Sequence, residues 1–148
     1  MTAAGLARSD WALSENPGDP VDAAARAMAL PPGPMLRVFL RLVERWGLER
    51  SETMALLGIR SRTTFTRWRD DPDGASLDLV TRERIGHVFG IQAACVTLFG
   101  EGSASDGWVK RPNEGPLFGG RTPISRMTSG WTGELERVRT HLQRESRR

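Results

Sequence analysis

Apolar side chains recur every three or four residues from Met35 onward, and this spacing most constrains the fold. Leu36, Leu40, Val43 and Trp46 fall on one side of a helix, while arginines and glutamates fill the other side. Similar stretches follow, separated by helix-ending glycines and by serines or aspartates that suit the start of the next helix. No alternating strand pattern occurs in the sequence. We therefore predict an all-α fold.

Turn-forming residues divide the chain into short helices. Residues 21–30 are alanine-rich and lie between the turn segments ENPGDP and LPPGP, with Asp19 or Asp22 suited to the helix N-terminus. Gly90 is expected to interrupt the most apolar stretch, and GEGSASDG at residues 100–107 has the composition of a linker. The expected helices cover residues 21–30, 35–46, 52–57, 62–69, about 77–89, 91–99, a short helix opening at Pro123, and 131–144.

Positive charge is concentrated in two regions. The formal net charge is +3, and the pI of about 10.3 reflects a basic set made of arginines apart from Lys110. Residues 34–72 hold eight arginines against five acids, and residues 101–148 hold nine basic residues against six acids, so each region carries +3. This distribution suits a DNA-facing module joined to a second basic contact surface.

The run SETMALLGIRSRTTFTRWR, residues 51–69, has the form of a helix-turn-helix. One helix, with Ser51 as its expected cap, ends at Gly58; Ile59 supplies an apolar contact in the turn, and Ser61 caps a second helix. This layout resembles the Xre-type, Cro/repressor-like helix-turn-helix, whose second helix lies in the major groove of DNA. Phe65 and Trp68 should face the protein core.

The resemblance implies DNA contacts for most of the remaining side chains of that second helix. Arg62, Thr63 and Arg67 would contact bases, joined by Thr66, since arginine pairs with guanine and a threonine methyl touches thymine. Phosphate contacts would come from Arg60, Ser61, Thr64 and Arg69. Proteins of this class bind two-fold operators as homodimers. Residues 77–99 are the candidate dimer surface, because they form the most apolar stretch outside the motif.

The segment WVKRPNEGPLFGGRTPISRMTSG, residues 108–130, has an unusual order of residues. Trp108, the Pro112-Asn113 turn, Leu117, the Gly119-Gly120 pair, Pro123 and Gly130 are followed by apolar positions at Val138 and Leu142. This order resembles the C-terminal toxin-binding domain of the Xre/MbcA/ParS family of antitoxins. We accordingly expect three parts: a poorly ordered arm with a short helix at residues 1–33, a helix-turn-helix domain with dimerisation helices at 34–100, and a toxin-binding domain at 101–148.

The family resemblance implies a protein partner rather than a reaction. A bacterial cytoplasmic location is expected separately, because the sequence shows no long apolar segment, no signal peptide and no possible intramolecular disulfide. Antitoxins of this family pair with RES-domain toxins, which act on NAD or transfer ADP-ribose, and cover the active-site cleft of the toxin. The expected partners are thus a cognate RES-domain toxin and operator DNA. Tryptophan and arginine are frequent interface anchors. The candidate toxin contacts are Trp108, Arg111, Asn113, Leu117, Phe118, Arg121, Arg139, Arg144, Arg147 and Arg148. The last four belong to a basic tail that starts at Arg137.

Structural alternatives accompany each of these interpretations. Trp108, Leu117 and Phe118 could build the core of the small C-terminal module, and the arginine-rich tail could be a solvated helix end. The helix-turn-helix could survive only for dimerisation. Two other functions remain open: a stand-alone dimeric regulator without a toxin partner, and a protein inhibitor without DNA activity.

Nothing in the sequence favours an enzyme or a metal site. His87 and His141 are the only histidines, and neither has a cysteine or acidic partner at metal-ligand spacing. Residues 118–120, FGG, lack the pattern of a phosphate-binding loop. Cys95, the single cysteine, fits a core position. We expect no catalytic residue, no cofactor, and no membrane association, because a long apolar segment, a signal peptide and a lipidation motif are all absent.

Overall fold

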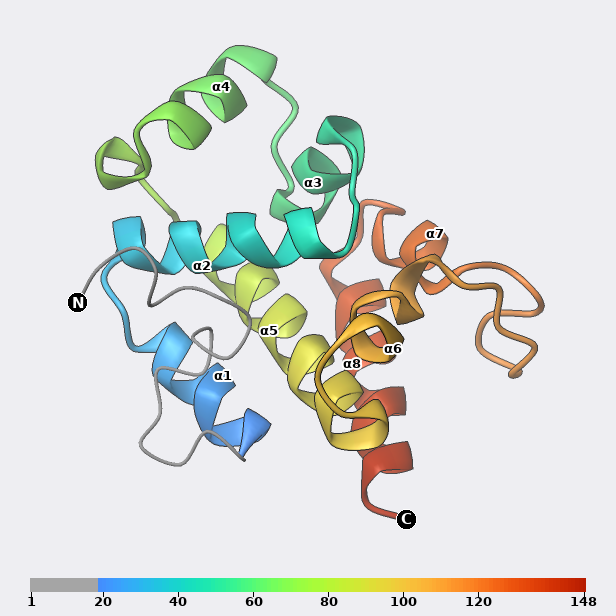
Figure 1. Cartoon of the computed structure of the whole chain (residues 1–148). Coiled ribbons are helices and arrows are strands. Elements are labelled where there is room, and N and C mark those ends of the chain that lie inside the picture. Colours follow the sequence, from blue (N-terminus) through green and yellow to red (C-terminus); the bar gives the residue numbers. More distant parts are fainter. Residues whose placement is uncertain (1–18) are drawn as a thin grey trace.

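The computed structural model describes residues 19–148, and these residues form helices and connecting loops without a strand (Figure 1). The predicted all-α fold is therefore confirmed. The α-helices are α1 (Pro20–Met28), α2 (Pro32–Arg45), α3 (Arg50–Leu57), α4 (Arg62–Asp70), α5 (Leu79–Phe99), α6 (Ser103–Asp106), α7 (Pro123–Met127) and α8 (Thr132–Ser146), with single 3-10 turns η3 (Pro72–Gly74) and η4 (Trp108–Lys110).

The long helix α5 forms the centre of the fold, and it packs against α1, α2, α3, α6 and α8. Figure 1 shows it running diagonally behind α2 toward the C-terminal half. The expected break at Gly90 is wrong, because α5 continues through it. A Cβ atom at Gly90 would lie 2.4 Å from Nε of Arg139, so this glycine makes room for a side chain from α8. The reason for the glycine is a tertiary contact rather than a helix end.

Helix α1 is part of the core. Asp19 caps it by accepting hydrogen bonds from the backbone N–H groups of Val21 and Asp22, at 3.0 and 3.2 Å. Ala23 and Ala27 are fully buried against α5, where small side chains allow the two helices to approach closely. The short helix expected at residues 21–30 of the N-terminal arm corresponds to α1, whereas residues 1–18 of that arm lie outside the described residues.

The helix-turn-helix has the predicted helices but one different cap. Glu49 and Glu52, rather than Ser51, form a reciprocal capping box at the start of α3. Gly58 ends α3 with a φ of +76°, and Ser61 caps α4 by accepting from the backbone N–H of Thr64 at 3.1 Å. Phe65 and Trp68 are buried, as predicted. The fixed caps set the angle at which α4 leaves α3 (Figure 1).

The expected linker at residues 100–107 is wrong, because this stretch contains α6 and packs against α5. The carboxylate of Asp106 accepts a hydrogen bond from the guanidinium of Arg45 in α2 at 2.9 Å, and the side-chain amide nitrogen of Gln92 in α5 lies 3.5 Å from the same carboxylate. The side-chain oxygen of Gln92 accepts a hydrogen bond from the indole N–H of Trp46 at 3.0 Å. Lys110 forms a second tie to the first half of the chain through an ion pair of 3.1 Å with Glu52 of α3. The C-terminal module is consequently anchored to the helix-turn-helix.

The loop at residues 111–122 is closed by backbone bonds between Asn113 and its far end. The N–H of Asn113 donates to Arg121 and its carbonyl accepts from Gly120, at 3.0 and 2.8 Å, while its side chain accepts from the N–H of Gly115. Gly119 and Gly120 have φ values of +57° and +87°, as their sequence predicts. The loop projects beside α7 in Figure 1. It places Leu117 next to the end of α8.

Candidate functional site

The exposed side of α4 carries the predicted DNA contacts. Arg62, Thr63 and Arg67 are exposed, and Thr64 and Thr66 are half-buried beside them. No carboxylate of the described residues forms a salt bridge with Arg62 or Arg67. Arg69 differs, since its Nε lies 3.3 Å from Asp70. The free cations of α4 thus lie in its N-terminal two-thirds.

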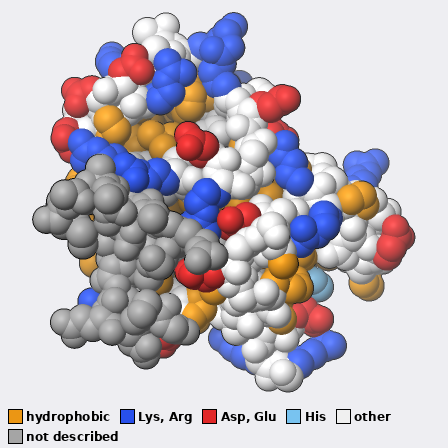
Figure 2. Space-filling view, viewed as in Figure 1, with side chains coloured by type: hydrophobic (Ala, Val, Ile, Leu, Met, Phe, Trp, Pro, Cys, Tyr) orange, Lys and Arg blue, Asp and Glu red, His pale blue; other side chains and the backbone are white. Residues whose placement is uncertain are grey.

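The opposite end of α4 is acidic. Arg37 of α2 forms an ion pair of 2.5 Å with Asp73, and this hydrogen bond holds the pKa of the Asp73 carboxyl below its usual value. Asp70 and Asp71 are also exposed there. Figure 2 shows both basic and acidic side chains around the top of the molecule, where α4 lies. A polyanion would be attracted to the N-terminal end of α4 and repelled from its C-terminal end.

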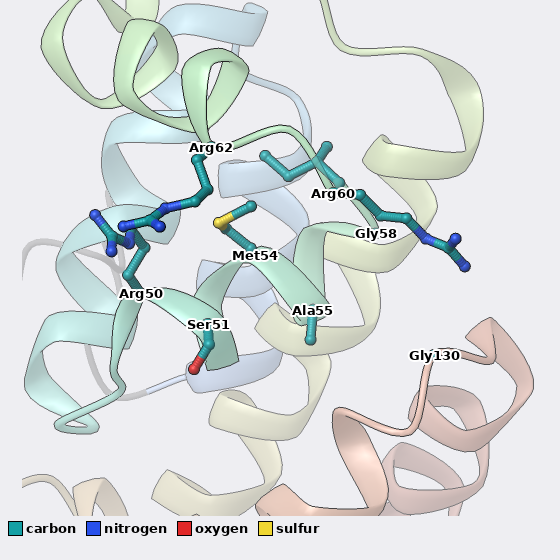
Figure 3. Close-up of a pocket in the computed structure, with 9 residues that line it drawn as sticks. Arg50, Ser51, Met54, Ala55, Gly58, Arg60, Arg62 and Gly130 are labelled. Carbon is teal, nitrogen blue, oxygen red and sulfur yellow. The ribbon is translucent and has the colours of Figure 1, made fainter.

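A groove of about 610 Å³ adjoins the start of α4, and we call it the α3–α4 groove (Figure 3). Arg62 contributes to it, so the groove continues the exposed surface of α4. In Figure 3, Arg50 and Arg62 lie at one end and Arg60 reaches toward the end that carries Gly130. Its lining consists of Arg50, Ser51, Met54, Ala55, Gly58, Ile59, Arg60, Arg62 and Gly130.

A buried arginine joins the two walls of this groove. Arg84 of α5 is 3% exposed, and its guanidinium donates to the carbonyls of Leu56 and Ala55, at 2.7 and 2.8 Å, and to the hydroxyl of Thr132 at 2.9 Å. Burial lowers the pKa of Arg84, yet an arginine keeps its proton at neutral pH. The carbonyl of Leu56, at the end of α3, therefore receives a donor from α5, and the carbonyl of Ala55 receives one in addition to the N–H of Gly58. We call this arrangement the Arg84 clasp.

A second groove, of about 800 Å³, lies at the far end of the molecule between the end of α5, the 113–117 loop and the last turns of α8. We call it the C-terminal groove. Figure 2 shows basic side chains gathered at this end of the molecule. Five predicted toxin contacts line it: Trp108, Asn113, Leu117, Arg144 and Arg148.

The other predicted toxin contacts are distributed differently. Phe118 is buried and packs edge-on against Trp108, with ring centroids 5.7 Å apart, so both rings form the core of the module. Arg139 faces the opposite side of α8 and lies near His87 of α5. Arg111, Arg121 and Arg147 are exposed but do not line the C-terminal groove.

Several residues of the C-terminal groove were not predicted from the sequence, among them Leu98, Phe99 and His141. Leu98 and Phe99 end α5, and Phe99 remains 43% exposed although most of residues 84–95 of the same helix are buried. His141 of α8 packs its ring edge-on against Phe118, with centroids 5.6 Å apart. Leu98 and Phe99 belong to the apolar run IQAACVTLF, which reads as a core segment throughout. Within this run only Gln92 and Thr97 are polar, and neither marks the exposure of Phe99.

The pair formed by His87 and Arg139 provides a stability prediction. Burial first, and then the Arg139 charge 3.3 Å from Nδ1, lower the pKa of His87 below its usual value of 6.5. The unfolded chain then binds the proton more readily than the folded chain. The contribution of His87 to the free energy of unfolding should be fully present above pH 6.5, the usual pKa of histidine in the unfolded chain. It should be lost as the pH falls from there through the lowered pKa of His87 in the folded chain.

Urea unfolding, monitored by circular dichroism at several pH values from about 8 to about 5, would measure this loss, because that range covers the usual histidine pKa. His87→Gln is the matched control, because an amide keeps an acceptor for Arg139 but does not titrate. The variant should lose less stability in acid than the parent chain. An equal loss in both would assign the pH dependence to other groups.

The described residues contain no helix that is long and apolar enough to cross a membrane. Among them, no group of three or more histidine, cysteine, aspartate and glutamate side chains has the arrangement of a metal site.

Comparison with known proteins assigns both halves of the chain. Residues 25–91 match the antitoxin Xre-like helix-turn-helix domain, and residues 95–146 match the antitoxin Xre/MbcA/ParS C-terminal toxin-binding domain. The chain belongs to the Xre/MbcA/ParS family of antitoxins. The protein y4oB of Sinorhizobium fredii (strain NBRC 101917 / NGR234) is 34% identical over 107 residues, which cover 72% of this chain and 80% of that protein. No solved structure matches the chain at a significant level.

Proposed function

We propose that this chain is the antitoxin of a toxin–antitoxin pair, that it blocks the active site of a RES-domain toxin acting on NAD or ADP-ribose transfer, and that it binds its own operator through α4. Membership of the antitoxin family supports the general role. The observation that carries the toxin-binding part is the C-terminal groove, in which five separately predicted contacts converge. The RES-domain identity of the toxin rests on the resemblance of residues 108–130 to this family.

The chemistry of the C-terminal groove suits a protein partner. Leu98, Phe99 and Leu117 provide an apolar wall, while Arg144 and Arg148 provide cations at the edge. Interfaces of this kind combine a desolvated apolar centre with a polar rim. Arg147 is exposed next to the groove residue Arg148, which lies 3.4 Å from Glu145, and the proposal assigns both arginines to carboxylates of the toxin. A toxin bound here would have the exposed 113–117 loop across its surface.

Operator binding is proposed for the exposed side of α4. Arg62 and Arg67 have the geometry of free cations on one helix, with Thr63 and Thr66 between them. A helix with such a surface can enter the major groove, where arginine reads guanine. The hydroxyl of Ser61 caps α4 by accepting a hydrogen bond from the N–H of Thr64. Because Ser61 is exposed, the same hydroxyl is also available to a phosphate of the operator.

The proposed homodimer would use a smaller surface than residues 77–99. Most apolar side chains of α5 are covered by α1 and α8 of the same chain. Besides Phe99 in the C-terminal groove, the large apolar side chains of α5 that remain exposed are Leu79 and Val80 at its start, with exposures of 83% and 56%. Adjacent exposed aliphatic side chains are costly in an isolated chain. We therefore place the dimer contact at the start of α5.

The toxin-binding proposal can be tested by expressing the chain together with the protein encoded beside it, and by measuring complex formation, host growth and NAD content. Truncation before Trp108 would expose the α5 surface that α8 covers, so single substitutions are more informative. Phe99→Glu should abolish protection, because a carboxylate would be buried in the apolar wall of the groove. Arg144→Glu should weaken the complex by charge reversal.

Thr97→Glu is the control for Phe99→Glu, since it puts the same charge on an exposed position of the same helix, facing α1 instead of the C-terminal groove. Its complex should be indistinguishable from that of the parent chain. Full protection by Phe99→Glu would show that the groove is not the toxin contact. A parent chain that forms no complex but still binds operator DNA would instead indicate a stand-alone regulator, and a complex without operator binding would indicate a pure inhibitor.

A further inference from the structure

We propose that the toxin-binding domain itself contacts DNA: the turn at residues 129–131 forms, together with Arg50 and Arg60, a second contact with the sugar–phosphate backbone of the operator. This inference rests on the proposed operator binding by α4. It assigns the α3–α4 groove, and the exposed Trp131 beside it, to the DNA surface.

Unpaired positive charge is the first observation. Arg50, Arg60 and Arg62 line the same groove, and among the described residues no carboxylate lies within salt-bridge distance of any of them. Some exposed arginines elsewhere in the chain are paired with acids, as in Arg37–Asp73 and Arg148–Glu145, whereas none of these three is. Three like charges around one groove repel one another, and an anion between them would relieve that repulsion.

Continuity with α4 identifies that anion. Arg62 begins α4 and also lines the groove, so a duplex whose major groove receives α4 would have a flanking strand running along the side where Arg50 lies (Figure 3). A DNA strand presents a phosphate charge at regular intervals, which matches several separate cations better than a small anion does. Ser51 adds an exposed hydroxyl beside Arg50. Such contacts position a protein without reading the sequence.

The opposite wall of the groove belongs to the toxin-binding domain. Gly130 lines the groove, and Figure 3 shows Arg60 extending toward it. The next residue, Trp131, is 76% exposed. An exposed tryptophan has little value to the fold, but it can donate to a phosphate and cover a deoxyribose with its ring.

The Arg84 clasp makes this second wall rigid. Arg84 bonds to both the last carbonyls of α3 and the hydroxyl of Thr132, with the carbonyl of Gly130 at 3.5 Å from Nη1. The turn at residues 129–131 is thereby held at a fixed place relative to Arg50 and Arg60. A contact residue on a fixed turn binds without the entropic cost of ordering a mobile loop.

The test measures operator binding at several salt concentrations. The readout is the fluorescence anisotropy of labelled DNA taken from upstream of the coding sequence. Arg50→Gln and Arg60→Gln should each reduce the slope of log K against log salt by about 0.9, the value of one lost phosphate contact. Preference for operator over unrelated DNA should not change. Trp131→Ala should weaken binding about fivefold to tenfold at every salt concentration, a loss of the order given for one aromatic contact with nucleic acid.

Arg121→Gln is the matched control for charge, because Arg121 is exposed in the same domain but outside the groove. Trp131→Phe keeps a ring without the indole N–H and guards against a folding defect in Trp131→Ala; each variant is checked by thermal unfolding. Slopes for Arg50→Gln and Arg60→Gln equal to that of Arg121→Gln, with intact operator binding, would overturn this inference and leave the proposed function standing.

Two other results would also overturn it. If Arg50→Gln, Arg60→Gln and Trp131→Ala keep full DNA affinity but weaken the complex with the toxin, the groove holds an acidic segment of the protein partner. If the parent chain does not bind operator DNA at all, the DNA-binding part of the proposed function fails with it. Measuring operator binding by the unsubstituted chain alone identifies this last result, because in every other outcome that chain binds operator DNA.

Discussion

Operator binding is expected to weaken by about 2–6 kcal/mol when Arg62 and Arg67 are both replaced by alanine, since each bidentate arginine–guanine pair contributes about 1–3 kcal/mol. Both side chains are exposed and free of salt bridges, so their removal should leave the fold intact. Specificity should relax together with affinity, because these two residues are assigned to bases and not to phosphates. Anisotropy titrations with operator DNA and with unrelated DNA would measure both quantities.

The control for this prediction is Arg121→Ala combined with Arg147→Ala, which removes the same charge from exposed positions far from α4 in the sequence. It should change operator affinity only by the general electrostatic effect of two lost charges. Equal losses in the two double variants would mean that α4 does not read bases. An unchanged affinity in Arg62→Ala/Arg67→Ala would remove α4 from the DNA interface altogether.

Replacement of Arg84 by methionine should lower the free energy of unfolding by about 3 kcal/mol. Hydrogen bonds from a charged donor are worth about 1.5–3 kcal/mol each, and part of this is offset because the buried charge no longer has to be desolvated. The buried carbonyl of Leu56 would lose its donor, and the half-buried carbonyl of Ala55 would keep only the N–H of Gly58. Methionine fills much of the volume of the arginine stem, so the loss would report the hydrogen bonds more than a cavity.

Thr132→Val separates the parts of the Arg84 clasp, because it removes only the bond between Arg84 and the start of α8. It should cost about 1 kcal/mol, the typical net value of one hydrogen bond. Urea unfolding of both single variants and of the double variant would give the coupling between the two side chains. A methionine variant no less stable than the valine variant would show that the bonds to α3 contribute nothing.

Local signals in the sequence were sufficient for the helix-turn-helix. Ser61 and Gly58 act on neighbouring backbone groups, so the bounds of α4 and the end of α3 could be predicted without knowing the rest of the fold. The cap of α3 was assigned two residues too late, because Ser51 is a strong capping residue and the reciprocal pair of Glu49 and Glu52 is a subtler pattern.

Long-range contacts explain the failures. Gly90 looks like a break but accommodates Arg139, which is distant in sequence, and the stretch at residues 100–107 looks like a linker but contains Asp106, whose partner is Arg45. Neither partner can be identified from spacing. The alanines of α1 likewise gave no sign that they pack on α5. Helix propensity alone does not say what a helix will be covered by.

The candidate sites were predictable to different degrees. Exposure on α4 follows from helix periodicity, since Phe65 and Trp68 define the buried side and thereby the outer one. The C-terminal groove depends on three separate segments, so Phe99 could not be assigned to it from its apolar neighbours. Arg139 was placed with the toxin contacts because the tail was treated as one basic unit, whereas a helix distributes its residues over all sides.

The continuity of α5 restricts how antitoxins of this kind can exchange partners in evolution or in the laboratory. The two family segments meet between residues 91 and 95, in the middle of that helix, whereas composition alone places the boundary near residue 100. A chimera joined at residue 100 would graft a foreign α8 onto a native α5, and their shared core would be mismatched. Recombinants that retain a folded core would have to inherit the second half of α5 together with its own α8.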